Sequence, residues 1–534
     1  MKIIIKLVKI LMIILLCNYI NTKILSVPPN KDIQDTIKPI IKLEFSDYLV
    51  ELEKVLIDIE SINTYSNKEI YNIYNEYYIK LLNVDKNTIN NKELYDTINF
   101  YLLNKTKYYS NNLILDIMYK DNKMFNNINS LLSLGINDNK ELDKYTSEFN
   151  KIKEYIYDYN IYIKGLDYNH IYLNNNIIDN IIININKYID YKYNNKLIED
   201  NIIKPLKILR DTLNNIKNNN NLKDNSISTY NKGKELYEVI VSDNTSSINS
   251  VDCIYNDLIN HYILIQDKLN NIYINNKQAF IDKNNYHYTM IDYKDTMDIF
   301  KDISISLYPN LDNYDYISKY SKDNSMLDIL YINDNLIHNN EDIIIVNKNY
   351  ILNDSLDSYY SLAYNGYLGK LYFNNYYKNN TNNINRYINF KGTNNSLITF
   401  NSINSYKYII DNKDISDIMS IEKEINIVLL SILDIGINYY NWDNNTIYNK
   451  LKELNINDNY INNNIDIYTK LVKNEPGKSL SYSYGLINYN KMYNDTINNN
   501  KDILEYNKFI VNNYNKPLFI IKDNYNKYIG DNNE

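Results

Sequence analysis

The sequence is poor in residues that break helices, cross-link the chain or bind metals. Its 534 residues include seven prolines, ten glycines, four histidines, two cysteines and one tryptophan. Because proline and glycine are the strongest helix breakers, we predict a mostly α-helical protein. If Cys17 is removed with an N-terminal leader, no disulfide can form within the chain, and Cys253 is expected to be a free, buried thiol.

The few histidines do not form a metal-binding pattern. No two of the four lie at the spacing that would place them side by side on one helix; they are His170, His261, His287 and His338. We therefore expect ordinary surface or core histidines rather than zinc ligands.

An excess of positive charge is also missing. The formal net charge is −8, and it becomes −11 if residues 1–22 are removed, because they carry three lysines and no acids. Phosphate binding needs a basic surface, so nucleic acid is excluded as a partner. The composition is 44% hydrophobic and 13% aromatic, which is enough for a core. Ile and Tyr recur at helical spacing within the Asn-rich stretches, and this favours ordered structure over disorder.

Long apolar runs are confined to the N-terminus. Residues 1–22 contain three lysines followed by an apolar segment, which is typical of a secretory signal peptide. The remaining residues 23–534 are then a single helical domain that is secreted or extracellular. An uncleaved membrane anchor is the alternative, and lipidation of Cys17 is a third possibility. Contact with a membrane is expected only through this segment.

Periodicity predicts the main elements. Apolar residues recur at helical spacing in 45–59, 67–82 and 94–103, and 145–189 is expected to form two long helices with a turn near Gly165. Residues 341–353 are rich in β-branched side chains and predict a short strand. An edge strand at this place would hold an extended peptide through backbone hydrogen bonds.

The stretch that follows, residues 359–373, reads YYSLAYNGYLGKLYF. It resembles the signature of domain of unknown function 885 (DUF885), a bacterial family of predicted zinc peptidases, which reads roughly L-A-H-E-G-Y-P-G-H-H. The chain keeps the framework of this signature at Leu362, Ala363, Gly366, Tyr367 and Gly369.

The resemblance implies that the zinc chemistry is lost. The first His of the signature falls on Tyr364, the Glu on Asn365, and the closing pair of His on Lys370 and Leu371. A phenol with a pKa of about 10 is a poor ligand at neutral pH, an amide cannot take a proton, and an ammonium repels a dication. We therefore expect no zinc, no other cofactor and no metal ligands, and regard the chain as a pseudoenzyme.

Further segments resemble the family in the same order along the chain. The matching residues are Gly233, Glu235, Tyr237, Glu424, Asp434, Gly436, Ile437, Trp442, Pro476, Gly477, Leu480, Tyr482 and Gly485. The resemblance implies that the chain retains three functional residues, Glu424, Asp434 and Tyr482. A bare carboxylate at Glu424 would be costly on its apolar helix, so it is either solvated at the wall of a cleft or paired with Lys370.

The resemblance implies a large, gluzincin-like, two-lobed metallopeptidase scaffold with many helices and a few short strands. Three functions stay open. The first is an inactive, secreted homologue whose cleft binds a peptide or a protein partner. The second is an active hydrolase with a rearranged site that uses Glu424, Asp434 and Tyr482, and the third is a structural or surface protein.

Overall fold

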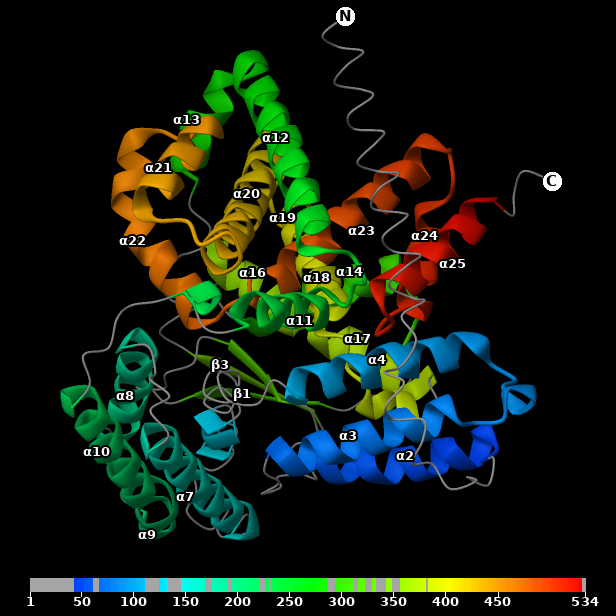
Figure 1. The fold of residues 1–534 in the computed structure, drawn as a ribbon. Helices are drawn as coiled ribbons and strands as arrows, with labels where there is room; N and C mark the ends of the chain where they lie inside the picture. Colours follow the sequence, from blue (N-terminus) through cyan, green and yellow to red (C-terminus); the bar gives the residue numbers. More distant parts are fainter. Residues whose placement is uncertain are drawn as a thin grey trace, which may run out of the picture.

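The computed structural model describes residues 43–60, 67–110, 124–125, 127–129, 131–132, 146–168, 175–190, 195–219, 226–229, 232–286, 293–311, 316–321, 329–332, 342–347, 356–380 and 383–530. These residues form a mostly α-helical fold with a few short strands, as predicted (Figure 1). The predicted leader, Cys17, His170, His287 and His338 lie outside the described residues. In the described part, no helix is both long and apolar enough to cross a bilayer.

The first helices form one layer of the molecule (Figure 1). They are α2 (Phe45–Glu60), α3 (Asn67–Leu82) and α4 (Lys92–Ser110), with the 3-10 helix η2 (Lys86–Thr88) before α4. The apolar stripe predicted for α2 is confirmed, since Phe45, Tyr48, Leu52, Leu56 and Ile59 are all buried. With α3, α4 and η6 (Asn383–Tyr387) they make a separate core.

A second group of helices lies beside the sheet. It comprises α7 (Thr146–Tyr168), α8 (Asn175–Asp190), α9 (Lys196–Ile198), the π-helix η3 (Glu199–Ile203) and α10 (Lys204–Asn219). The two predicted long helices are present as α7 and α8, but the turn near Gly165 is wrong, because α7 continues through this residue. A Cβ atom on Gly165 would meet nothing within 4 Å, so no contact requires a glycine or a break there.

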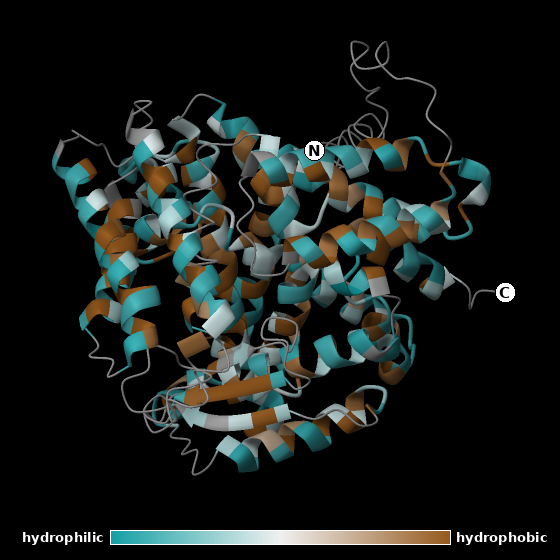
Figure 2. Ribbon diagram, turned by 90° about the horizontal axis from the view of Figure 1, so that it is seen from below, coloured by the Kyte–Doolittle hydropathy of each residue, from teal (hydrophilic) through white to brown (hydrophobic). Residues whose placement is uncertain are grey.

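The sheet contains β1 (Tyr316–Ser321), β2 (Ile329–Ile332) and β3 (Asp342–Asn347) in the order β1-β3-β2. The predicted strand is β3. Its alternate residues enter two different cores: Ile343 and Ile345 pack with α7, α8 and α10, and Ile344 and Val346 pack with α14 (Tyr293–Leu307) and α16 (Leu356–Asn365). Burial on both faces explains the continuous apolar run, which Figure 2 shows as an arrow that is brown over most of its length.

The prediction that this strand is an edge strand is wrong. β1 pairs with β3 in parallel and β2 pairs with it antiparallel, so both sides of β3 are occupied. Its backbone therefore has no free side on which to add a peptide strand.

The remaining helices include α20 and α23, and the others pack around these two. They are η4 (Ile227–Thr229), α11 (Gly233–Thr245), α12 (Val251–Asn275), α13 (Lys277–Asn284), α17 (Lys370–Asn380), α18 (Lys391–Asn404), α19 (Tyr406–Ile409), α20 (Lys413–Asn438), α21 (Asn444–Glu453), α22 (Asp458–Asn474), α23 (Leu480–Asn498), α24 (Ile503–Asn512) and α25 (Leu518–Gly530). Helix α23 contributes Tyr484 to a core with α12 and α20 and Tyr489 to a core with α18 and α24. Because it is shared between two cores, α23 is buried on most of its surface.

Candidate functional site

The residues that resemble the zinc-peptidase signature form the end of α16, a tight turn and the start of α17. Both glycines of this turn stand where a side chain would collide with the backbone. A Cβ atom on Gly369 would lie 2.0 Å from the carbonyl oxygen of Tyr364, and one on Gly366 would lie 2.7 Å from that of Leu362. The turn thereby holds Lys370, the first residue of α17, close to Tyr364 near the end of α16.

These two side chains are in contact. The Nζ atom of Lys370 lies 5.0 Å from the ring centroid of Tyr364, within the range of a cation–π interaction. The ring of Tyr364 stacks on that of Tyr360 at 6.1 Å and lies 6.4 Å from that of Tyr482 on α23. Its hydroxyl donates to Oδ1 of Asn395 on α18, at 3.3 Å. We call these five residues from four helices the Tyr364–Lys370 cluster.

Burial controls the electrostatics of this cluster. Desolvation by the surrounding protein lowers the pKa of Lys370 to about 8, although the side chain is only half-buried. Burial also raises the pKa values of Tyr360, Tyr364 and Tyr482, so these phenols stay neutral at physiological pH. The cluster thus combines one weakly solvated ammonium with three neutral hydroxyl groups.

Asn365, at the position that the resemblance gives to the catalytic Glu, joins α16 to the sheet. The residue is 7% exposed. Its Nδ2 donates to the carbonyl oxygen of Ser361 at 2.9 Å and to that of Ile329 in β2 at 3.4 Å. A carboxylate has no hydrogen to donate to either carbonyl, so the amide is the side chain that fits this position.

Replacing Asn365 by Glu is expected to lower the free energy of unfolding by about 2 kcal/mol, because a buried carboxylate would face two carbonyl oxygens. Asn365→Gln keeps the amide donors and is the matched control, with a smaller expected loss. Urea-induced unfolding of both variants measures the difference. If the Glu variant were as stable as the Gln variant, the donor role of Asn365 would be refuted.

Glu424 does not pair with Lys370. It is 8% exposed and lies in the middle of α20. Its Oε1 lies 2.6 Å from Nε2 of His261 on α12 and accepts a hydrogen bond from Nδ2 of Asn490 on α23, at 2.5 Å. The described residues contain no ion pair between Lys370 and Glu424, so that hypothesis is wrong. The alternative of a solvated carboxylate is also wrong, because His261 and Asn490 reach Glu424 across the packed helices.

Asp434 connects three segments that carry the family resemblance. It has no exposed surface. Its Oδ1 accepts from the hydroxyl of Tyr237 (2.8 Å) and from Nδ2 of Asn438 (3.0 Å), its Oδ2 accepts from Oγ of Ser479 (2.7 Å), and the backbone N–H of Gly477 lies 2.9 Å from both oxygens. Burial raises the pKa of Asp434 to about 6, and these hydrogen bonds oppose the rise. Asp434 therefore ties α20 to α11 and to the turn before α23.

Two retained glycines have packing roles near Asp434. A Cβ atom on Gly436 would lie 2.1 Å from the ring of Trp442, the single tryptophan of the chain. Gly477 has a φ of +76°, a backbone conformation that favours glycine. Gly436 therefore lets Trp442 pack against α20, and Gly477 lets the turn before α23 approach α11.

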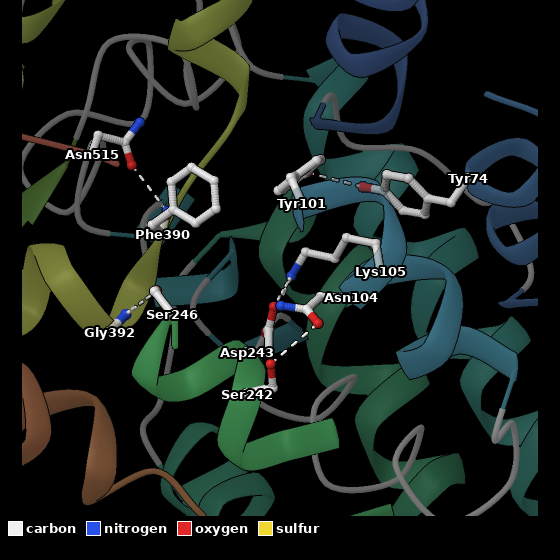
Figure 3. Close-up of polar contacts among 10 residues, drawn as sticks. All are labelled: Tyr74, Tyr101, Asn104, Lys105, Ser242, Asp243, Ser246, Phe390, Gly392 and Asn515. Atoms are coloured by element: carbon white, nitrogen blue, oxygen red, sulfur yellow. Dashed lines mark hydrogen bonds and ion pairs between the residues drawn. The ribbon is translucent and has the colours of Figure 1, made fainter. Parts of the chain in front are cut away.

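Polar contacts also position α18, which carries Asn395 (Figure 3). The half-buried pair Lys105–Asp243, at 2.8 Å, joins α4 to α11. In the turn that follows α11, Oγ of Ser246 accepts from the backbone N–H of Gly392 at the start of α18, at 3.1 Å. The second contact ties the start of α18 to the turn after α11, and the first joins α11 to α4.

The fold is shared with two bacterial proteins. One, from Colwellia psychrerythraea, is described as a "putative lipoprotein"; it superposes with a TM-score of 0.64 at 10% identity, covering 91% of this chain and 99% of the other. The second, from Shewanella oneidensis, is described as a "putative lipoprotein of unknown function" and gives a TM-score of 0.59 at 10% identity, covering 90% and 99%. No protein-family model and no curated protein matches the chain. At this identity the likeness concerns the fold alone.

Cys253 differs from the prediction in two respects. It is half-buried near the start of α12, and it is disulfide-bonded rather than free. The expectation of a free thiol rested on removal of residues 1–22, which include Cys17. The other cysteine, Cys17, lies outside the described residues.

Sequence reasoning missed the partners that complete these sites. His261 and Asn490 flank Glu424, and Asn395 bonds Tyr364, yet these residues lie on helices far from their partners in sequence. No spacing or motif marks them. His261 is half-buried and lies against Glu424. Within the described ranges, no three His, Cys, Asp or Glu side chains are grouped as a metal site would require.

Proposed function

We propose that the protein is an exported, non-hydrolytic relative of the DUF885 peptidases, and that its Tyr364–Lys370 cluster binds a peptide or a protein partner. The observation that supports this best is the contact between Lys370 and Tyr364. The resemblance assigns zinc ligands to these two positions, and ligands of one ion must lie close together. Their proximity fits a metal site whose ligands have been replaced.

The replacement residues argue against hydrolysis at this place. Lys370 is more than half protonated at pH 7, since its pKa is about 8, and an ammonium repels a divalent cation. The pKa of Tyr364 is raised well above the ordinary value by burial, which disfavours the phenolate that could bind zinc. Asn365 cannot take a proton from a water molecule.

The proposed location outside the cytoplasm rests on the N-terminal segment. Its lysines and apolar run are typical of an export signal. The Colwellia and Shewanella proteins that share the fold are each described as a "putative lipoprotein", which supports export of this chain as well.

A rearranged hydrolase that uses Glu424, Asp434 and Tyr482 together is less well supported. Glu424 and Asp434 are ten residues apart on α20, which corresponds to about 15 Å along a helix. Asp434 is fully buried and bonded to protein donors. Of these three residues, only Tyr482 belongs to the Tyr364–Lys370 cluster.

We expect the purified protein to contain substoichiometric zinc and to show no chelator-sensitive cleavage of peptides. Zinc is measured by plasma mass spectrometry and cleavage by chromatography of a peptide mixture. The double variant Tyr364→His, Lys370→His should bind zinc more tightly than the wild type, because two imidazoles would then face each other. Stoichiometric zinc in the wild type, together with cleavage that a chelator abolishes, would overturn the proposal.

A further inference from the structure

Lys370 is a positive charge without an acidic partner among the residues that the structure describes. Two other half-buried lysines are neutralised: Lys105 pairs with Asp243 at 2.8 Å, and Lys283 pairs with Glu422 at 2.7 Å. The contact of Lys370 is instead the face of the Tyr364 ring. Because a weakly solvated ammonium is costly unless an anion neutralises it, this position favours binding of an anion.

The side chains of the cluster are partly exposed to solvent, whereas most of the neighbouring residues in the sequence are buried. Between residues 362 and 373, only Tyr364 and Lys370 keep appreciable exposed surface, and all the others are buried. Tyr360, Asn395 and Tyr482 also remain half-buried. Residues from α16, α17, α18 and α23 thus each keep some solvent-accessible surface at the cluster.

We propose that the Tyr364–Lys370 cluster binds a carboxylate, with Lys370 supplying the charge and the neighbouring hydroxyl groups supplying hydrogen bonds. The carboxylate belongs to the C-terminus of a peptide or to an acidic side chain of it. This inference rests on the proposed function and names its ligand class. The ring of Tyr364 would pack against the apolar part of the same ligand, since the face of an aromatic ring is apolar.

The titratable groups around Lys370 are consistent with this assignment. The phenols of Tyr360 and Tyr364 on α16 and of Tyr482 on α23 are kept neutral by burial, which raises their pKa values. Two ion pairs lie beside the cluster: Lys423 on α20 pairs with Asp357 on α16 at 2.9 Å, and Lys478 pairs with Glu475 near Tyr482 at 2.6 Å. Asn365 and Asn395 do not titrate. Lys370 is therefore the group whose protonation would control binding.

Competitive acetylation of lysines, read by mass spectrometry, tests the proposal on the wild-type protein. The probes are N-acetyl-trialanine with a free carboxylate, the same peptide as its amide, and N-acetylglutamic acid α-amide, which carries only a side-chain carboxylate. We expect at least one acid to slow acetylation of Lys370 several-fold and the trialanine amide to have no effect. The exposed Lys508 on α24 is the internal control, and its acetylation should not change.

Affinity for the protective acid, measured by calorimetry, should fall about tenfold per pH unit above pH 8, because the bound anion requires the protonated lysine. Lys370→Met should abolish binding, and Lys508→Met should preserve it. Equal acetylation of Lys370 with all three probes, or unchanged affinity in Lys370→Met, would overturn the carboxylate assignment. If only the carboxylate assignment fails, a protein without zinc and without peptidase activity is still consistent with a non-hydrolytic function. Stoichiometric zinc together with peptide cleavage would instead refute the proposed function.

Discussion

Replacing Asp434 by Asn is expected to lower the free energy of unfolding by about 3 kcal/mol, because four donors converge on a buried carboxylate. Asparagine offers one acceptor oxygen, and its NH2 group would face Oγ of Ser479 or the backbone N–H of Gly477, which are themselves donors. Urea-induced unfolding measures the loss. Asp466→Asn on α22 is the matched control, since Asp466 is exposed and its replacement should change stability by less than about 0.5 kcal/mol.

The effect of Asp434→Asn should depend on pH with a defined sign. Burial raises the pKa of Asp434 from 3.8 to about 6, so the folded state binds a proton more tightly than the unfolded state does. Protonation of Asp434 therefore stabilises the wild type as the pH falls from 6 to 4, and this contribution is lost as the pH rises through 6. The stability difference between wild type and variant should grow over that interval by up to about 1.4 kcal/mol per pH unit. A difference that stays constant between pH 4 and 7 would contradict the raised pKa.

Replacing Gly369 by Ala should have the second large effect, a loss of about 3 kcal/mol or more in the free energy of unfolding. Its Cβ atom would lie 2.0 Å from the carbonyl oxygen of Tyr364 and 2.6 Å from that of Ala363. Both obstacles are backbone atoms and cannot rotate away, so the turn between α16 and α17 must open. Lys370 should then move away from Tyr364, and its pKa should rise towards the ordinary value as it gains solvent.

Gly165→Ala on α7 is the matched control for this variant. Nothing lies within 4 Å of its Cβ position, and alanine favours a helix over glycine by up to about 1 kcal/mol. Gly165→Ala should therefore be neutral or stabilising. Thermal unfolding compares the two variants, and equal transition temperatures would show that the Gly369 turn tolerates a side chain.

The elements were the most predictable part of the molecule. The stripe from Phe45 to Ile59 predicted α2 because a helix that covers a core must be apolar at every third or fourth position. The β-branched run predicted β3, because a strand that is buried on both faces is apolar along most of its length. Its place at the centre of the sheet was not predictable, since that depends on β1 and β2, which pair with it from other parts of the chain.

The candidate site was predictable only in part. The resemblance at residues 359–373 located Tyr364 and Lys370, and the structure brings these two together. It did not reveal that Glu424 pairs with His261, 163 residues earlier in the chain. The role of Asp434 also depends on Tyr237 and Ser479, which approach it from different segments.

The sequence by itself determined the helices, the central strand and the chemical types of the side chains in the signature, because these depend on local periodicity and on residue identity. Tertiary structure alone decided which charges are paired. Helix packing placed Glu424 beside His261 and left Lys370 against an aromatic ring. Electrostatic interactions depend on distance and burial in space, and neither of these quantities follows from the order of residues along the chain.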